Sequence, residues 1–422
     1  MGRRGGRARS RSVLAALVAA SCAHPEVNPI APPPPAVSRA PQVRVGLNVS
    51  ASGGSLTLGG GAALTLVAPE AGGGWIGEIP AGTRTPVEIA GGSLRFRTAG
   101  GVLTPGGVVL VSGSSSNSRV RLNSRDYRGT LRLEVVDGRI NAINLVDLEE
   151  YLVGVVGAEM GIRTAADFSA MQAQAIVSRT IALQRIGQPR ARAYDLVPTV
   201  ADQVYGGVGF ENELAERAAL LTRGQTLSYQ GRLIDAFFHS TCGGRTVPGT
   251  EVFAAANRPY LRSVSDLDEA GRAWCAISPR YRWRETWTGE SLARALHETM
   301  PIVGAPAGLA TSLRDLRVTE RTGTGRVARV AFQGTNANYS VTGPVARLLL
   351  RPGDGGLLRS TNFTIQVTRT GDRIAGVVVD GTGAGHGVGM CQWGAIGRSR
   401  AGFSYRSILS AYFPGTELSR SY

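Results

Sequence analysis

The chain has 422 residues, of which 43% are hydrophobic, so it can bury one large core or two ordinary ones and is long enough for an enzyme. All 46 basic residues are arginine, which excludes phosphate-loop, Schiff-base and kinase-type sites that need a lysine. The formal net charge of +15 suggests a polyanionic partner, either nucleic acid or an acidic envelope polymer. Because the arginines are dispersed among 31 acidic residues, without a basic helix or a run interleaved with aromatics, we expect no nucleic-acid binding.

The amino terminus has the pattern of an export signal. Five arginines precede the apolar run Val13–Ala20, which is too short to cross a bilayer as a helix but has the length of a signal peptide. The small residues before Cys22 also fit a lipoprotein site, so acylation of Cys22 and ordinary cleavage are both open. We predict a signal peptide over residues 1–22 and an exported protein of the periplasm or cell envelope. Its only membrane contact would be a lipid anchor, and its net charge after cleavage would be +10.

The fold class predicted for the rest of the chain is α+β. A proline-rich linker is predicted over residues 23–42, a β-rich region over 43–145, and a mixed helix and strand region over 146–422 with a β-rich insertion around 310–380. Helical periodicity begins at Leu148 and returns after Thr164. Further helices are expected at Glu211–Leu221, Ser291–Thr299, Pro344–Leu350 and Tyr405–Tyr412. Strands are expected at Val43–Asn48, Leu64–Val67, Leu94–Thr98, Val108–Val111, Leu131–Val136, Ile140–Leu145, Gln225–Tyr229, Leu233–Phe238, Asp315–Glu320, Val327–Phe332, Phe363–Thr370 and Arg373–Val379.

One carboxylate stands out by its position. Glu159 follows the apolar face of the predicted helix from Leu148, where the helix gives way to a loop. A carboxyl group at such an edge is partly desolvated, which raises its pKa and keeps it protonated as a general acid. The alternative from the sequence alone is a solvated glutamate near a helix end.

Cysteines and histidines suggest a second site. His239 and Cys242 lie three residues apart at a predicted strand end, and Cys275 offers a third soft ligand for zinc. A disulfide between Cys242 and Cys275 is the alternative in an oxidising compartment. A glycine-rich segment over residues 381–395 adds His386 and Cys391, whose spacing on a loop does not define a thiol-nucleophile pair.

These segments resemble, in this order, the stage II sporulation protein D / amidase-enhancer family of bacterial cell-wall proteins. The matching text is "LEEYLVGVVGAEM", "AMQAQAIVSRTIAL", "YDL" with "DQVYGG", "AFFHSTCGGRT", "GAGHGVGMCQWGA" and "ILSAYFPGTEL". The resemblance spans roughly Val43 to Leu418 and implies a peptidoglycan lytic transglycosylase that acts on peptide-stripped glycan strands. The catalytic glutamate of the family falls on Glu159. In this chemistry one carboxyl group protonates the glycosidic oxygen and then takes the proton of the muramic-acid C6 hydroxyl, which leaves a 1,6-anhydro end.

The resemblance also implies a set of supporting residues. The candidate substrate-binding residues are Gln172, Gln174, Arg179, Gln203, Tyr205, His386 and Gln392. The zinc-binding members of the family imply a structural metal at His239 with Cys242 and Cys275, and Cys391 is a further candidate ligand. Two departures are Gly161 where the family has proline, and Gln172 where it has lysine.

Two rival functions stay open at this point. One is a non-catalytic peptidoglycan-binding protein that enhances a cell-wall amidase, with an N-acetylmuramoyl-L-alanine amidase as its partner. The other is a zinc hydrolase built on His239 and the cysteines, although closed thiolate sites are usually structural.

Overall fold

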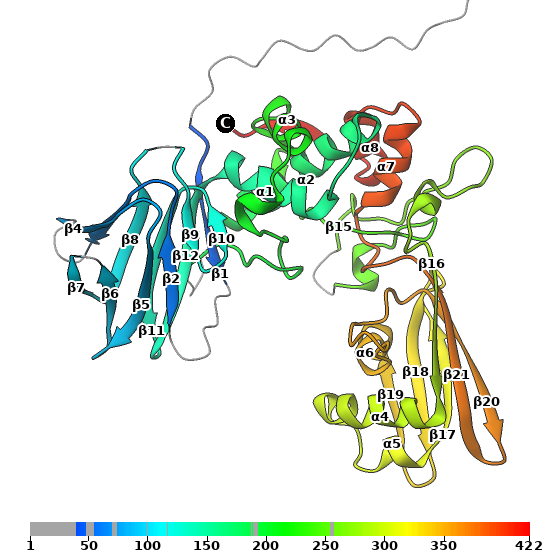
Figure 1. The fold of residues 1–422 in the computed structure, drawn as a ribbon. Helices are drawn as coiled ribbons and strands as arrows, with labels where there is room; N and C mark the ends of the chain where they lie inside the picture. Colours follow the sequence, from blue (N-terminus) through cyan, green and yellow to red (C-terminus); the bar gives the residue numbers. More distant parts are fainter. Residues whose placement is uncertain are drawn as a thin grey trace, which may run out of the picture. The chain divides into compact units, whose positions relative to one another are not determined.

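The computed structural model of the protein describes residues 39–47, 55–69, 74–98, 100–115, 117–186, 188, 193–253 and 257–422. The predicted signal peptide, Cys22 and most of the proline-rich linker lie outside the described residues. Within the described part, helices and strands mix as the predicted α+β class requires, and the β-rich part comes first (Figure 1). Among these residues no helix is both long and apolar enough to span a bilayer.

Two six-stranded antiparallel sheets form the amino-terminal part of the chain. The first has the order β1 (Gln42–Leu47), β12 (Arg139–Asp147), β11 (Thr130–Val136), β8 (Val108–Gly113), β3 (Leu64–Ala68) and β4 (Gly74–Ile79). The second has the order β10 (Arg125–Tyr127), β9 (Val120–Leu122), β2 (Leu56–Gly59), β5 (Arg84–Ala90), β6 (Ser93–Thr98) and β7 (Gly101–Gly106). Residues alternate between buried and less buried along strands such as β3 and β6, and their buried side chains belong to one core.

Helices follow directly on the last strand of the first sheet. Asp147 ends β12 and caps α1 (Leu148–Met160) by accepting a hydrogen bond from the Glu149 backbone N–H. The later helices are α2 (Phe168–Ile186), α3 (Glu213–Leu221), α7 (Gln392–Arg400) and α8 (Tyr405–Tyr412), and the short 3-10 helices are η2 (Ala165–Asp167), η3 (Gly207–Phe210), η4 (Gly249–Glu251) and η5 (Trp274–Ile277). Small strands accompany them: β13 (Gln225–Tyr229), β14 (Arg232–Leu233), β15 (Phe238–His239), β22 (Met390–Cys391) and β23 (Glu417–Arg420).

The packing of α1 depends on glycine. A Cβ on Gly157 would lie 1.8 Å from the carbonyl oxygen of Phe210, and a Cβ on Gly154 would lie 2.9 Å from the ring of Tyr205. The two glycines of the helix therefore let η3 and the segment before it approach the backbone of α1 closely, beside the end that carries Glu159.

The segment between β15 and β22 in the sequence forms two three-stranded sheets with a hydrophobic core of their own. Their orders are β16 (Arg282–Thr288), β21 (Arg373–Thr382), β20 (Phe363–Thr370) and β17 (Leu313–Arg321), β18 (Val327–Gly334), β19 (Asn338–Thr342). The accompanying helices are α4 (Gly289–Thr299), η6 (Met300–Val303), α5 (Leu309–Ser312) and α6 (Gly343–Leu349).

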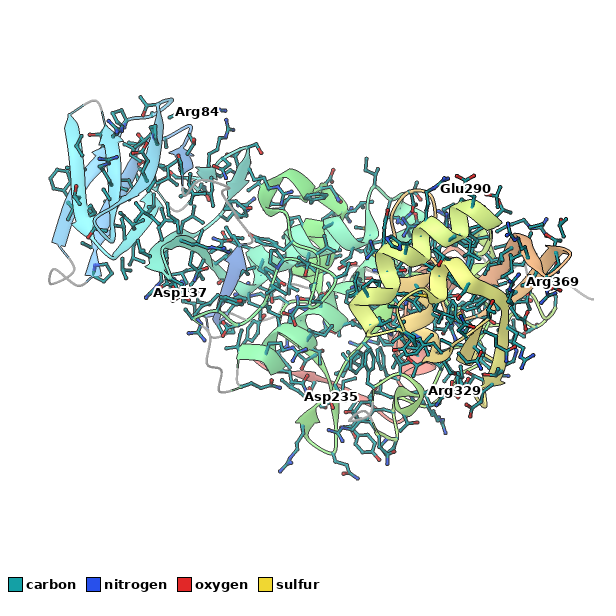
Figure 2. The ribbon with its side chains drawn as sticks, turned by 90° about the horizontal axis from the view of Figure 1, so that it is seen from below. Arg84, Asp137, Asp235, Glu290, Arg329 and Arg369 are labelled. Atoms are coloured by element: carbon teal, nitrogen blue, oxygen red, sulfur yellow. The ribbon has the colours of Figure 1, made fainter. Side chains whose placement is uncertain are left out.

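Exposed arginines of this part pair with neighbouring acids. Arg329 donates to Glu320 at 3.3 Å and Arg369 pairs with Asp315, and both arginines lie among the surface side chains in Figure 2. The charge of this segment is thus interleaved on the surface as well as in the sequence.

Most expected elements are confirmed, with end shifts of up to three residues. The expected strand Leu233–Phe238 is wrong: β14 ends at Leu233, β15 begins at Phe238, and the residues between them are irregular. Helix α7 was not expected, because its sequence QWGAIGRSR contains two glycines and has no clear apolar stripe. Several further strands were also missed, among them β2, β4, β5 and β16.

Candidate functional site

Glu159 lies in the last turn of α1. The helix ends at Met160, and Gly161 takes φ +68°, a value that the ring of proline excludes, so the glycine at this position is required by the local backbone. Ile162, the next residue, is 95% exposed, which places the end of α1 at the protein surface while Met160 is buried. Glu159 itself is half-buried at this edge.

Two neutral donors hold the carboxylate of Glu159. Its Oε1 accepts from the backbone N–H of Val204 at 2.8 Å, and its Oε2 accepts from the side-chain amide of Gln392 at 3.3 Å. Burial raises the pKa of Glu159 above its ordinary value, and the two hydrogen bonds offset only part of that rise. The carboxyl end of a helix, where carbonyl oxygens point outward, further disfavours a negative charge. These conditions keep a carboxyl group protonated to higher pH without a charged partner.

A chain of buried amides stands behind Gln392. The Nε2 of Gln392 also lies 3.4 Å from Oε1 of Gln174, and the amide of Gln174 donates to Oγ of Ser178 one helical turn further along α2. Gln174 and Ser178 are fully buried and Gln392 is nearly so. The structure thus brings Gln174 and Gln392 together near Glu159: Gln392 contacts the carboxylate, and Gln174 contacts Gln392.

Gln203 and Tyr205 face into the protein on either side of Val204. The amide of Gln203 donates to the Ser178 carbonyl at 3.3 Å, and its oxygen accepts from the hydroxyl of Tyr151 at 3.1 Å. The hydroxyl of Tyr205 donates to Asn144 at 2.9 Å. Both side chains are buried, so they do not present the free sugar contacts that the resemblance implied. They fix the segment in the position from which the Val204 N–H reaches Glu159.

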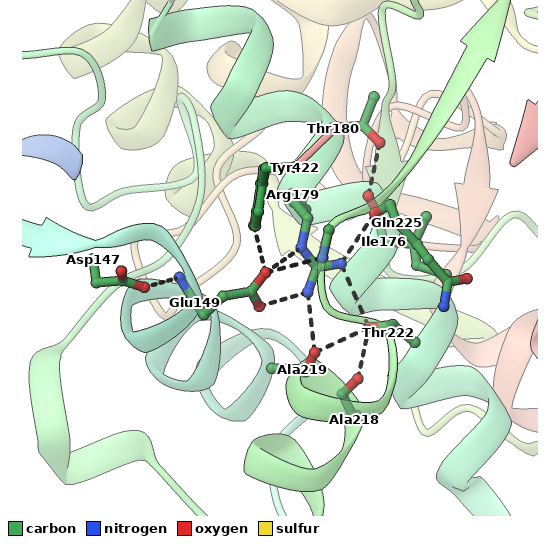
Figure 3. Close-up of polar contacts among 11 residues, drawn as sticks. Asp147, Glu149, Ile176, Arg179, Thr180, Ala218, Ala219, Thr222, Gln225 and Tyr422 are labelled. Atoms are coloured by element: carbon green, nitrogen blue, oxygen red, sulfur yellow. Dashed lines mark hydrogen bonds and ion pairs between the residues drawn. The ribbon is translucent and has the colours of Figure 1, made fainter. Parts of the chain in front are cut away.

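Arg179 is likewise not placed for contact with a sugar. It is fully buried, and its guanidinium makes a two-bond ion pair with Glu149 at 2.9 and 2.7 Å (Figure 3). Its remaining donors bond to the Gln225 carbonyl, the Ala219 carbonyl and the Thr222 hydroxyl, as Figure 3 shows. Burial alone would raise the pKa of Glu149, but the charge and hydrogen bonds of Arg179 lower it below its ordinary value. The pair ties α1 to α2 and to the end of α3.

Gln172 points away from this group. It is two residues before Gln174 on α2, so its side chain leaves the helix about 200° around the axis from that of Gln174. Among the described residues its side chain makes no hydrogen bond. The nearest cationic side chain in sequence to Glu159 is Arg163, whose guanidinium lies over the ring of Trp393, the neighbour of Gln392, at 4.7 Å from the centroid.

The two histidines lie at the parallel pairing of β15 with β22. Nδ1 of His386 accepts from the Val388 N–H at 3.1 Å and its Nε2 donates to the Phe238 carbonyl at 2.8 Å. Burial lowers the pKa of His386 to about 4, so the ring is neutral, and both nitrogens serve to fasten the glycine loop. His239 donates from Nδ1 to the Val388 carbonyl at 3.1 Å, and its ring centroid is 5.5 Å from that of His386.

The cysteines gather at one point without His239. The ligand atoms of Cys242, Cys275, Cys391 and Asp266 all lie within 4.8 Å of one another, and all four residues are buried. The expected set of His239, Cys242 and Cys275 is therefore corrected: His239 lies outside the cluster, Cys391 lies in it, and Asp266 was missed. Sequence reasoning passed over Asp266 because a single aspartate, 24 residues from Cys242 and nine from Cys275, carries no spacing signal.

Comparison with known proteins covers most of the described chain. Residues 136–229 match the family described as "Stage II sporulation protein", and residues 275–389 match "Domain of unknown function (DUF8618)". The chain is 29% identical over 298 residues to an uncharacterised protein of Brachyspira hyodysenteriae, a match that covers 70% of this chain and 73% of that protein. It is 27% identical to the amidase enhancer of Bacillus subtilis, covering 72% of this chain and 45% of the enhancer. It is 28% identical to stage II sporulation protein D of Bacillus subtilis, covering 66% of this chain and 76% of that protein.

Proposed function

We propose that this chain, which resembles stage II sporulation protein D and the amidase enhancer over most of its length, is an exported peptidoglycan lytic transglycosylase with Glu159 as its single acid and base. The substrate is the glycan strand of the cell wall, stripped of its stem peptides. The product is a strand that ends in 1,6-anhydro-muramic acid.

The first step uses Glu159 as an acid. Its protonated carboxyl donates to the oxygen of the glycosidic bond, and the bond between that oxygen and C1 of muramic acid breaks. The half-buried position of Glu159 supports this role, because burial raises its pKa and keeps the carboxyl group protonated to higher pH than an exposed glutamate.

The second step uses the same group as a base. The carboxylate left after proton donation takes the proton of the C6 hydroxyl while that oxygen bonds to C1 of the same sugar. Gln392 and the Val204 N–H each donate to one carboxylate oxygen, so they stabilise the charge in this interval and fix the orientation of the group. Because the hydroxyl of the sugar replaces water, one carboxyl group completes the reaction and a second acid is not required.

The observation that carries the proposal is the environment of Glu159: a carboxyl group at the surface end of a helix, partly desolvated, and held by two uncharged donors. Gln392, one of the residues that the resemblance implied as sugar contacts, donates to this group, and Gln174, another of them, contacts Gln392. Several contacts that fix the orientation of one acidic group are typical of a catalytic residue.

A second candidate is the non-catalytic role in the name of a relative. The match to a protein named amidase enhancer covers 72% of this chain, and on this reading the protein would bind peptidoglycan and stimulate an N-acetylmuramoyl-L-alanine amidase.

Product analysis separates the two candidates. Purified protein is incubated with denuded and with intact glycan strands, and the fragments are identified by mass spectrometry. We expect anhydro-ended fragments from denuded strands and none from Glu159→Gln. The matched control is Glu150→Gln, on the same helix and also with a pKa raised by burial, which should leave cleavage unchanged. Binding without cleavage by the wild-type protein would refute the transglycosylase and favour the enhancer.

A further inference from the structure

The loop that joins α1 to η2 carries a cation without an anionic partner. The guanidinium carbon of Arg163 lies 4.7 Å from the ring centroid of Trp393. Among the described residues Arg163 makes neither a hydrogen bond nor an ion pair, and its Nε is buried without a partner. The stacking thus holds the arginine in place while its hydrogen-bonding capacity stays available for a ligand.

The geometry of stacking decides what kind of ligand fits. A guanidinium that lies over an aromatic ring contacts the ring with its flat face, so its N–H groups point sideways within its own plane. Two such N–H groups in parallel match the two oxygens of a carboxylate. The indole N–H of Trp393 also makes no hydrogen bond within the described part of the chain, and this residue is half-buried. The pair therefore offers a cation and an additional donor to an anionic ligand.

The charges around Arg163 favour an anion. Asp167 is the nearby acid that acts on Arg163, but its carboxylate already pairs with Arg400 at 2.6 Å. Burial lowers the pKa of the Arg163 guanidinium, the charge of Asp167 offsets part of this, and the charge of Arg400 lowers it further. Glu159 supplies no counter-charge while its carboxyl group is protonated. One positive charge of this loop is thus left without a counter-ion.

The cation lies beside the acid without contacting it. Trp393 directly follows Gln392, whose amide donates to Oε2 of Glu159 at 3.3 Å. Ile162, the residue before Arg163, is 95% exposed, so the loop is at the surface. A ligand that reaches Glu159 from solvent can therefore extend over Trp393 to the guanidinium.

We propose that Arg163, stacked on Trp393, binds the lactyl carboxylate of muramic acid in the glycan strand. This inference rests on the proposed function. In an intact strand the lactyl carboxyl is joined to the stem peptide by an amide bond, and removal of the peptide by hydrolysis frees it as a carboxylate. The lactyl group is an ether on O3 of the sugar, whereas the bond that breaks is at C1, so the two groups of one sugar need two separate protein partners. Arg163 thereby selects stripped strands over intact ones.

The test measures binding in the Glu159→Gln protein, so that no strand is cut. The probes are denuded strands, the same strands with their carboxyl groups converted to methylamides, and N-acetylglucosamine oligomers, which lack the lactyl group. We expect calorimetric titration to give roughly tenfold tighter binding of the carboxylate strands than of the amidated ones, as for one charge-assisted contact. Adding Arg163→Gln should remove this preference and leave the affinity for both neutral probes unchanged. The preference should also shrink as salt rises.

Two further variants are the controls. Arg282 is also a stacked arginine, with its guanidinium carbon 5.7 Å from the ring centroid of Tyr281, and it lies outside this loop. Arg282→Gln should keep the full preference. Arg163→Lys keeps the charge without the planar fork, so it should keep part of the preference. Melting curves of each variant check that the chain is folded.

Several outcomes would overturn the inference. Arg163→Gln that keeps the preference would show that another group reads the carboxylate, and an equal loss for all three probes would show a structural role. Failure of the Glu159→Gln protein to bind any of the probes would also reject the site. Cleavage by the wild type is scored separately: cleavage without an effect of Arg163→Gln on the preference rejects only the carboxylate site, whereas binding that depends on Arg163 without cleavage rejects only the transglycosylase.

Discussion

Replacing Arg179 by methionine tests whether this residue has a structural or a substrate-binding role, because the structure predicts how much unfolding free energy the variant loses. The variant removes five hydrogen bonds: two to Glu149, two to the carbonyls of Ala219 and Gln225, and one to Thr222. Glu149 keeps only the backbone N–H of Gly224 and the hydroxyl of Tyr422 as partners, and its charge remains buried.

The cost follows from that buried charge. Breaking a buried ion pair by removing one partner costs about 3–5 kcal/mol, roughly a fifth or more of the usual stability of a domain of about 5–15 kcal/mol. We expect Arg179→Met to lose roughly 4 kcal/mol of unfolding free energy, measured by urea titration followed by circular dichroism. The double variant Glu149→Met/Arg179→Met should lose much less, because no charge is left unpaired.

A surface pair provides the control. Arg284 and Asp380 form a two-bond pair with similar distances of 2.7 and 2.9 Å, but the arginine side chain is 66% exposed. Arg284→Met should leave the urea midpoint unchanged. The reasoning is refuted if Arg179→Met unfolds at the wild-type midpoint while its affinity for glycan strands falls, since that result would place the guanidinium on the substrate.

Two further predictions concern Glu159. Because its folded pKa lies above the unfolded value of about 4.5, its contribution to stability is full below that pH and is lost as pH rises through the folded pKa. At neutral pH, Glu159→Gln should therefore have a higher free energy of unfolding than the wild type, by about 1.4 kcal/mol per unit of pKa elevation, and a higher melting temperature. In calorimetry the difference should close near pH 4; a difference independent of pH would contradict this. Gln392→Met removes a hydrogen-bond donor that favours the ionised carboxylate of Glu159. The alkaline limb of the pH profile of kcat/KM for glycan cleavage should therefore move to higher pH by several tenths of a unit. A limb that stays in place would show that Gln392 does not act on Glu159.

Most helices and strands, and the resemblance to a known family, could be predicted from the sequence. Tyr405–Tyr412 was predicted residue for residue, because a serine cap precedes it and Pro414-Gly415 follows. The resemblance to the stage II sporulation protein D / amidase-enhancer family is confirmed by the matches over most of the chain. Strands such as β4 and β5 were missed because their glycine, proline and charged residues hide the alternation, and pairing with neighbours far away in sequence stabilises them.

The hydrogen-bond partners of Glu159 could be predicted only in part from the sequence. Its place at the end of an apolar helix face indicated a raised pKa, and the structure agrees. Its shortest hydrogen bond, at 2.8 Å, comes from the backbone N–H of Val204, and a backbone donor cannot be predicted from the type of the residue. The position of Asp266 could not be predicted for a related reason: the fold, and not a spacing along the chain, brings it close to three cysteines.

The polar residues of the motifs were assigned to the sugar because glutamine, tyrosine and arginine suit hydroxyl and acetamide groups, yet most of them are turned inward. A buried amide such as Gln203 already has its hydrogen bonds, and exchanging one for a sugar would leave a buried partner unsatisfied at a cost of about 1–3 kcal/mol. Under the proposed function, sugar recognition would therefore use groups that still have free hydrogen-bonding capacity at the surface beside Glu159. The edge of the stacked pair Arg163 and Trp393, next to Gln392, has the cation and the aromatic face that such a surface needs. In a chain without lysine, Arg163, on the loop after Glu159, is thus the cationic residue nearest to the carboxylate in sequence, and Gln172 of α2 supplies no charge of its own.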